Sequence, residues 1–252
     1  MIESNGQGLS LDGVSVNYGS VSALRNVDFK MARAECVGLV GLSGAGKTTL
    51  LGLFNGMVRP DRGHVHTLGT RLDTLSHRGL RTLRTSVGFV HQGLHLVPNL
   101  NVLQNVLLGR LGQISMARAL VLLTLPSRET LGAVHELLER VGIGDKLYER
   151  VDRLSGGELQ RVAIARALFQ KPRILLADEP VSSVDPARAR SVLELLTGVA
   201  REDGLTLCVS LHNVDLAREF FPRLVGMKAG RLAFDKPASA ISEDQLHSLF
   251  QL

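Results

Sequence analysis

A glycine-rich loop near the start of the chain carries the pattern G-x-x-x-x-G-K-[ST], whose residue types suit phosphate binding. Glycines let several backbone N–H groups converge on an anion, because a Cβ would block the φ angles and the close approach that this requires. Lys47 can reach the β- and γ-phosphates of a nucleoside triphosphate, and the Thr48 hydroxyl can ligate Mg²⁺. The residues expected to bind nucleotide here are Gly41, Leu42, Ser43, Gly44, Ala45, Gly46, Lys47, Thr48 and Thr49.

The segments on either side of this loop support the same interpretation. An apolar run at residues 36–40 precedes the loop, and residues 49–54 are helix-like. A helix that starts at the loop adds free N–H groups and the positive end of its dipole. The dinucleotide pattern G-x-G-x-x-G fails, because Thr49 stands where the third small residue belongs. We therefore expect a P-loop that binds a nucleoside triphosphate.

Two adjacent carboxylates, Asp178 and Glu179, follow an apolar run at residues 173–177. The run is typical of a buried strand, and α/β sheets place ligands at the C-terminal ends of such strands. Asp178 suits Mg²⁺ coordination, and Glu179 suits orienting or deprotonating a water that attacks the γ-phosphate. Adjacent carboxylates at a turn often only face solvent, but their position in a chain with a P-loop favours the catalytic interpretation.

A pair of glycines opens a strongly helical segment at residues 155–168. Ser155 and Glu158 have the spacing of a capping box, which by itself predicts a well-capped helix start. That interpretation leaves Gly156 and Gly157 unexplained, since a glycine inside a helix is destabilising by about 0.5–1 kcal/mol relative to alanine. Exposed N–H groups at a helix N-terminus can bind an anion. We therefore expect a second phosphate-binding element here.

Tyrosine and histidine side chains at four positions have two open interpretations each. Tyr18 is either an ordinary residue at a strand end, which is favoured when it is taken alone, or a surface on which a base stacks. His212 ends an apolar strand and could contact the γ-phosphate, although a lone histidine is usually structural. His64 and His66 share a strand face, but without a Cys or carboxylate partner nearby we expect solvated side chains rather than a metal pair.

Composition and charge exclude several classes of protein. The 252 residues carry a net charge of +5, but Lys and Arg are scattered, so nucleic-acid binding is not expected. Cys36 and Cys208 lie in apolar runs without metal or redox spacing, and we expect buried thiols in a reducing compartment. The N-terminus lacks a signal-peptide pattern, and the longest apolar stretch, residues 119–125, is far below the ~20 residues that span a bilayer.

The hydrophobic periodicity divides the chain into two kinds of segment. Residues 9–32 alternate apolar and polar side chains, which predicts antiparallel strands ahead of the P-loop strand. Residues 93–153 have helical periodicity and no strand candidate, as in an inserted helical subdomain. We predict one α/β domain over residues 1–252, with a core at about 1–92 and 165–252 and a helical subdomain at about 93–164.

Together these motifs resemble the ATP-binding subunit of ABC transporters, over residues 9–234. Residues 154–161 (LSGGELQR) are similar to that family's signature motif. The resemblance implies a P-loop NTPase (RecA-like) core with an antiparallel β edge and an inserted α-helical subdomain. It also implies that Tyr18 stacks on adenine, that Gln92 joins the Mg²⁺ site and the subdomain junction, that residues 182–185 cross a dimer interface, and that His212 is a switch histidine.

The resemblance further implies an ATPase that works as a pair. Each ATP would lie between one chain's P-loop and the other chain's signature, with Mg²⁺ held by Thr48, Asp178 and Gln92. The catalytic residues would be Lys47, Gln92, Glu179 and His212, and the residues acting in trans would be Ser155, Gly156, Gly157, Glu158 and Asp185. Implied partners are a second copy of the chain, transmembrane permease subunits and, indirectly, an extracytoplasmic solute-binding protein. The implied location is peripheral, at the cytoplasmic face of the inner membrane.

Within the superfamily, the sequence is most similar to ATP-binding subunits of phosphonate importers, at residues 109–112, 118–126 and 210–217. Two positions depart from the usual pattern: His91 stands where Gln or Phe is more usual, and Asn101 where Thr is common. The cargo stays open between phosphonate, phosphite, phosphate esters and another small anion. A soluble ABC-type ATPase is the alternative class, but the chain shows no coiled-coil insertion, zinc cluster or second P-loop.

Overall fold

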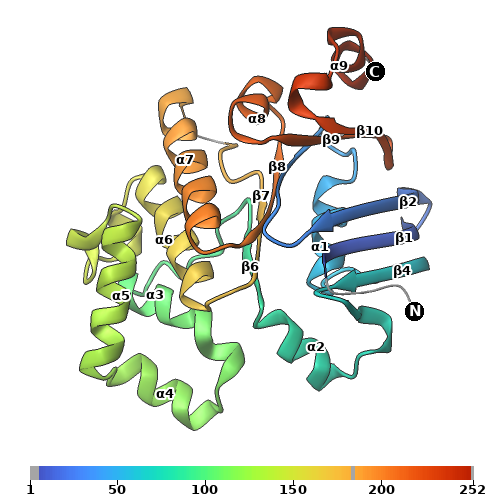
Figure 1. Cartoon of the computed structure of the whole chain (residues 1–252). Helices are drawn as coiled ribbons and strands as arrows, with labels where there is room; N and C mark the ends of the chain where they lie inside the picture. The colour runs from blue at the N-terminus through green and yellow to red at the C-terminus, as the bar shows by residue number, and fades with distance from the viewer. Residues whose placement is uncertain (1–5, 183–184, 251–252) are drawn as a thin grey trace.

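The computed structural model describes residues 6–182 and 185–250, which form two β-sheets and a group of helices (Figure 1). The strands are β1 (Gln7–Tyr18), β2 (Val21–Ala32), β3 (Cys36–Val40), β4 (Arg62–Thr67), β5 (Thr70–Arg71), β6 (Val87–Val90), β7 (Ile174–Asp178), β8 (Thr206–Leu211), β9 (Arg223–Lys228) and β10 (Arg231–Pro237). The α-helices are α1 (Lys47–Phe54), α2 (His77–Arg84), α3 (Val102–Leu107), α4 (Met116–Thr124), α5 (Arg128–Arg140), α6 (Gly156–Phe169), α7 (Pro186–Glu202), α8 (Val214–Phe220) and α9 (Glu243–Phe250).

The larger sheet has the strand order β10-β9-β3-β8-β7-β6. Its strands are parallel except for β10, which pairs antiparallel with β9. Every residue of β7 and β8 is buried, as expected of parallel strands covered on both faces. Parallel pairing brings the C-terminal ends of β3, β6, β7 and β8 to one edge of the sheet, and the predicted P-loop and carboxylate pair follow two of those ends.

The smaller sheet has the order β2-β1-β4-β5, and all of its pairs are antiparallel. This confirms the antiparallel strands that the alternation over residues 9–32 predicts. Leu11 of β1, Leu39 of β3 and Leu51 of α1 belong to one buried apolar cluster, so α1 joins the core between the two sheets (Figure 1). Burial of one helix against both sheets positions the start of α1, where the P-loop ends.

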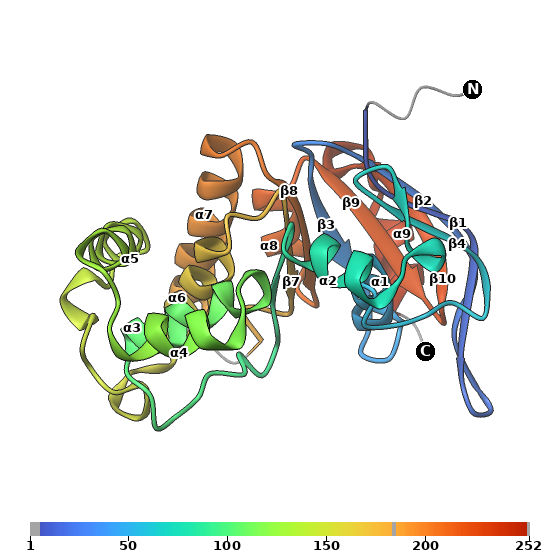
Figure 2. The same cartoon turned by 90° about the horizontal axis from the view of Figure 1, so that it is seen from below.

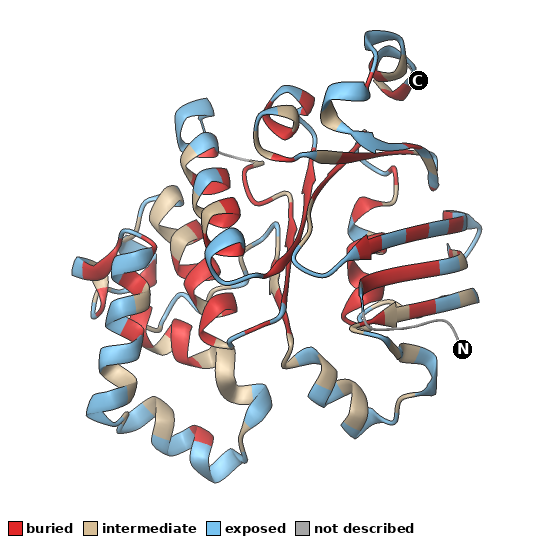
Figure 3. Cartoon of the chain, viewed as in Figure 1, coloured by how far each residue is buried: buried red, intermediate tan, exposed pale blue. Residues whose placement is uncertain are grey.

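Helices α3 to α7 lie on the side of the larger sheet that faces away from the antiparallel sheet, in both views (Figures 1 and 2). A second buried cluster joins Leu103 of α3, Val134 of α5, Ile164 of α6 and Leu193 of α7. Figure 3 shows buried residues along the strands of the larger sheet and along one side of α6 and α7. The predicted subdomain limit at residue 164 falls inside α6, which contacts both α3 and β6. The exact limits of the subdomain stay a prediction.

The prediction that both cysteines are buried is correct for Cys208 and wrong for Cys36. Cys208 is buried, and burial raises the pKa of its thiol to about 12. Cys36 is only partly buried, because it lies at the first position of β3.

Among the described helices, none combines the length and the apolar character needed to cross a bilayer.

Candidate nucleotide-binding site

The glycine loop leaves β3 at Val40 and enters α1 at Lys47, so the predicted strand–loop–helix order is confirmed. Gly46 has φ +106°, and a Cβ added there would lie 2.6 Å from the carbonyl oxygen of Ala23. A Cβ at Gly41 would lie 2.3 Å from the carbonyl oxygen of Met227. Only glycine fits at these two positions. The first backbone bond of the helix runs from the Leu50 N–H to the Gly46 carbonyl at 2.9 Å, so the preceding N–H groups of α1 have no intrahelical partner.

The Lys47 side chain bonds to the backbone of the P-loop. Its side chain is 4% exposed, and Nζ donates to the carbonyl oxygens of Gly41 at 2.9 Å and Leu42 at 3.1 Å. The same Nζ lies 3.2 Å from Oε1 of Glu179. A buried ammonium needs such partners, and a phosphate group at the loop would compete with Glu179 for this cation.

A buried serine organises the two carboxylates. Ser210 of β8 pairs in register with Asp178 of β7. Its hydroxyl donates to Oδ1 of Asp178 at 2.7 Å and accepts the backbone N–H of Glu179 at 2.8 Å. Glu179 has φ +44°, a left-handed conformation that costs a non-glycine residue about 1–2 kcal/mol, and the bond to Ser210 helps to hold it. Ser210 is not among the predicted site residues, because its sequence signal is only a hydroxyl within an apolar strand that ends at the same sheet edge.

Gln92 follows β6, and its side chain reaches the Glu179 carboxylate. Its Nε2 donates to Oε2 of Glu179 at 3.4 Å. The structure therefore brings together Lys47, Gln92, Asp178 and Glu179 from three separate strand ends. Burial, followed by the charges of His95 and Arg166, lowers the pKa of the neighbouring His91 to about 4, so this ring is neutral at pH 7.

The predicted signature starts a well-capped helix. The Ser155 hydroxyl accepts the N–H of Glu158 at 3.4 Å, and Oε2 of Glu158 accepts the N–H of Ser155 at 2.8 Å. The capping box is confirmed, and it commits the Glu158 carboxylate to the helix end. A Cβ at Gly156 would meet no atom within 4 Å, so the described residues of this chain give no steric reason for a glycine there.

Tyr18, His212 and Asp185 form no hydrogen bond or ion pair with Lys47, Gln92, Asp178 or Glu179 among the described residues, and their roles stay predictions. Tyr18 is 55% exposed at the end of β1, and His212 is exposed just after β8. Asp185 caps α7 by accepting the N–H of Arg188 at 3.1 Å. Two members of the predicted interface loop, Ser183 and Val184, lie outside the described residues.

The expectation that the paired histidines lack carboxylate neighbours is wrong. Nδ1 of His64 lies 3.5 Å from Asp73, and Nδ1 of His66 lies 3.2 Å from Asp12. Strand pairing and the turn after β4 bring these aspartates close, which sequence distance conceals. Within the described part of the chain, no group of three or more His, Cys, Asp or Glu side chains could hold a metal ion.

A family profile described as ABC transporter matches residues 24–182, which is more than half of the chain. The chain belongs to the ABC transporter family. Its fold is confirmed by a solved ABC cassette, the dimeric structure of MJ0796, described as a bacterial ABC transporter cassette. That structure has a TM-score of 0.80 and 29% identity, with 92% of this chain and 100% of the other covered.

Two named relatives are similar to this chain over nearly its whole length. A protein of Anaeromyxobacter dehalogenans named "Phosphonates import ATP-binding protein PhnC" is 48% identical over 98% of this chain, but this chain spans only 49% of that relative. One of Pseudomonas aeruginosa, named "Phosphonates import ATP-binding protein PhnC 1", is 46% identical over 96% of this chain and 90% of its own length. The cassette is accordingly an ABC ATPase, and the cluster at the sheet edge is its candidate ATP site.

Proposed function

We propose that this ABC ATPase powers the import of a phosphonate, or of a related small phosphorus-containing anion, through a membrane permease. The observation that carries the proposal is the 46% identity, over nearly the whole of both chains, to a protein named for phosphonate import. The similar segments at residues 109–112, 118–126 and 210–217 favour the same subfamily. Phosphite and phosphate esters are the competing cargoes.

In the proposed reaction, backbone N–H groups of residues 41–49 cradle the phosphates and Lys47 contacts the γ-phosphate. Because Lys47 is ion-paired with Glu179 in the structure, binding of the phosphate would draw the ammonium away and leave the Glu179 carboxylate to polarise the attacking water. Gln92, whose amide already lies 3.4 Å from Glu179, would orient the same water, and exposed His212 would approach from the end of β8.

Thr48, Asp178 and Gln92 are the residues that would hold Mg²⁺. Asp178 is 4% exposed, and its contact with Ser210 uses only Oδ1. Hydroxyl, amide and carboxylate oxygens are the ligand types that Mg²⁺ prefers, usually with substrate phosphates completing the shell. When bound, Mg²⁺ would neutralise charge on the β- and γ-phosphates.

The proposed active unit contains two copies of the chain. The steric freedom at Gly156 supports this. No described residue of its own chain requires a glycine there, and the absence of a side chain would let the γ-phosphate of ATP bound to a second copy approach the N-terminus of α6. Ser155, Gly156, Gly157 and Asp185 would contact the partner's nucleotide, while Glu158 would fix the Ser155 backbone. In this proposal the pair sits peripherally at the cytoplasmic face of the inner membrane, beneath permease subunits fed by a solute-binding protein.

A growth assay tests the cargo. In cells lacking their own phosphonate-importer ATPase, the chain with its cognate permease and solute-binding protein should support growth on methylphosphonate as sole phosphorus source. Glu179→Gln, which keeps the side-chain shape and removes the charge, should abolish this growth, while all strains grow on phosphate. Growth restored only on phosphite or a phosphate ester would reassign the cargo, and growth on none of the three would refute the proposal.

Size-exclusion chromatography of purified Glu179→Gln tests the paired unit. The variant should elute as a dimer with Mg²⁺ and ATP and as a monomer with ADP, because the γ-phosphate is the anion that joins the two copies. A monomer under both conditions would contradict the two-copy arrangement.

A further inference from the structure

The loop that carries Gln92 has an unfavourable backbone. Leu94 and His95 are consecutive non-glycine residues with φ values of +57° and +48°. Left-handed backbone costs such a residue about 1–2 kcal/mol, and two in succession must be held by their surroundings. The loop forms two tight internal bonds, from the Leu94 N–H to the His91 carbonyl at 2.8 Å and from the His95 N–H to the Gly93 carbonyl at 2.6 Å.

The Arg166 side chain of α6 donates hydrogen bonds to this turn. The guanidinium of Arg166 donates from Nη1 to the His95 carbonyl at 2.6 Å and from Nη2 to the Leu94 carbonyl at 2.5 Å. Both acceptors belong to the two left-handed residues, so one planar group fixes the orientation of two successive peptide units. Arg166 is half-buried, and burial lowers its pKa from the ordinary value. Among the ion pairs of the described residues none involves Arg166, so the two carbonyls are its main electrostatic partners.

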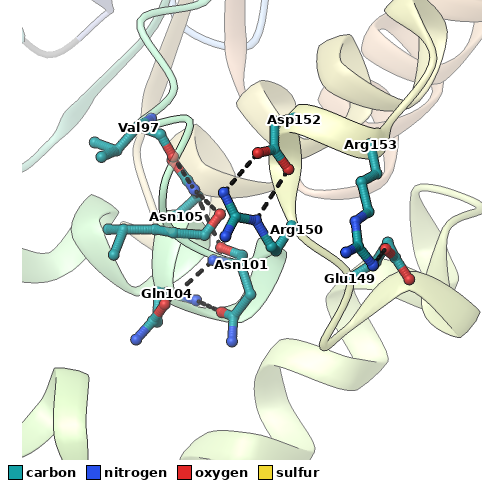
Figure 4. A network of polar contacts seen from close by, with 9 residues as sticks. Val97, Asn101, Gln104, Asn105, Glu149, Arg150, Asp152 and Arg153 are labelled. Atoms are coloured by element: carbon teal, nitrogen blue, oxygen red, sulfur yellow. Dashed lines mark hydrogen bonds and ion pairs between the residues drawn. The ribbon is translucent and has the colours of Figure 1, made fainter.

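The rest of the loop is anchored independently. Upstream, the His91 ring stacks between Phe89 and His95, with centroid distances of 4.3 Å and 4.5 Å. Downstream, the buried Asn105 of α3 accepts the N–H of Val97 at 2.8 Å and donates to the Val97 carbonyl at 3.1 Å (Figure 4). Between these anchors, Arg166 holds both carbonyls of the turn that follows Gln92.

We propose that Arg166 is a positioning residue for ATP hydrolysis, which holds the turn at Leu94 and His95 so that Gln92 faces Glu179. This inference rests on the proposed roles of Gln92 and Glu179. Arg166 is carried by the helix whose N-terminus is the proposed contact for the partner's nucleotide, about 16 Å away along the axis. The turn beside one ATP and the contact to the other are therefore attached to a single helix.

Arg166→Lys tests the proposal, with Arg84→Lys as the matched control. Arg84 of α2 also donates to two backbone carbonyls, from Nε to Asn55 and from Nη2 to Gly56, at 2.9 Å each, but these carbonyls lie at the C-terminal end of α1. Lysine keeps the charge and loses the two-pronged contact. We expect Arg166→Lys to lower kcat at least tenfold with KM for ATP within twofold of wild type, and Arg84→Lys to keep kcat within twofold at a similar loss of thermal stability.

Hydrogen–deuterium exchange supplies a readout that general destabilisation does not mimic. Amides of residues 91–97 should exchange at least tenfold faster in Arg166→Lys and at the wild-type rate in Arg84→Lys. Unchanged exchange with unchanged kcat in Arg166→Lys would overturn the inference. Gln92→Ala is measured alongside: if it hydrolyses ATP normally, the proposed role of Gln92 fails, whatever Arg166 does to the loop.

A second variant decides the matter if Arg166→Lys does not fold. His95→Gly removes the exposed ring and the strain at φ +48° but leaves the carbonyl that Arg166 holds. Since the carbonyl and not the ring is gripped, kcat should stay within threefold of wild type. A tenfold loss would show that the histidine stack positions the loop, and would refute the role of Arg166.

Discussion

Replacing Ser210 with alanine removes one oxygen atom that two elements of the catalytic edge share. The hydroxyl is completely buried, donates to the Asp178 carboxylate at 2.7 Å and accepts the Glu179 N–H at 2.8 Å. A hydrogen bond to a charged group contributes about 1.5–3 kcal/mol, and an N–H left unpaired costs about 1–3 kcal/mol. The two terms overlap, so we expect Ser210→Ala to lower the free energy of unfolding by about 3 kcal/mol.

The same substitution should slow hydrolysis. Without Ser210, the left-handed Glu179 loses its backbone anchor and the Asp178 carboxylate is free to rotate. A loss of about 1.4–2.8 kcal/mol in transition-state stabilisation corresponds to a 10- to 100-fold fall in kcat. The measurements are urea unfolding followed by circular dichroism and ATPase activity at saturating Mg²⁺ and ATP.

Thr206→Val provides the control on the same strand. Thr206 is 1% exposed, and its hydroxyl accepts the N–H of Ala34 at 3.0 Å at the opposite end of β8. This change should lower stability by about 1 kcal/mol and leave kcat within twofold. If Ser210→Ala were no more destabilising than Thr206→Val and kept wild-type kcat, the shared-hydroxyl reasoning would be refuted.

Two further substitutions test the proposed contact between two copies of the chain and the contacts of Arg223 that join the two sheets. Ser155→Arg should leave ATP binding by one copy intact, lower stability by about 1 kcal/mol through loss of the helix cap, and abolish the ATP-dependent dimer on size-exclusion chromatography; dimers formed by this variant would rule out the paired arrangement. Arg223→Ala should lower the free energy of unfolding by about 2–3 kcal/mol without changing KM for ATP, because the guanidinium bonds Asp235 at 2.6 Å, Glu35 at 2.8 Å and the Lys30 carbonyl at 2.8 Å, which lie on different strands or their ends. A denaturation midpoint of Arg223→Ala equal to that of wild type would contradict the predicted loss of stability.

Local chemistry explains what the sequence alone could predict. The P-loop is contiguous, and its glycines answer to local φ angles and close approach, so its pattern is visible without a fold. The strand before Asp178 is uniformly apolar because parallel strands are covered on both faces, and the capping box at Ser155 spans one helical turn. From these local features the fold class and most of the candidate site can be predicted without a structure.

The tertiary structure decided the contacts between residues far apart in the chain. Ser210 lies 32 residues from Asp178 in the chain and meets it only through the register of β7 and β8. Lys47 meets Glu179 only because the P-loop after β3 and the turn after β7 lie at one edge of the sheet. Arg166 grips carbonyls 71 and 72 residues away. No local periodicity encodes such pairs, because they follow from strand register and helix packing, which the whole chain sets together.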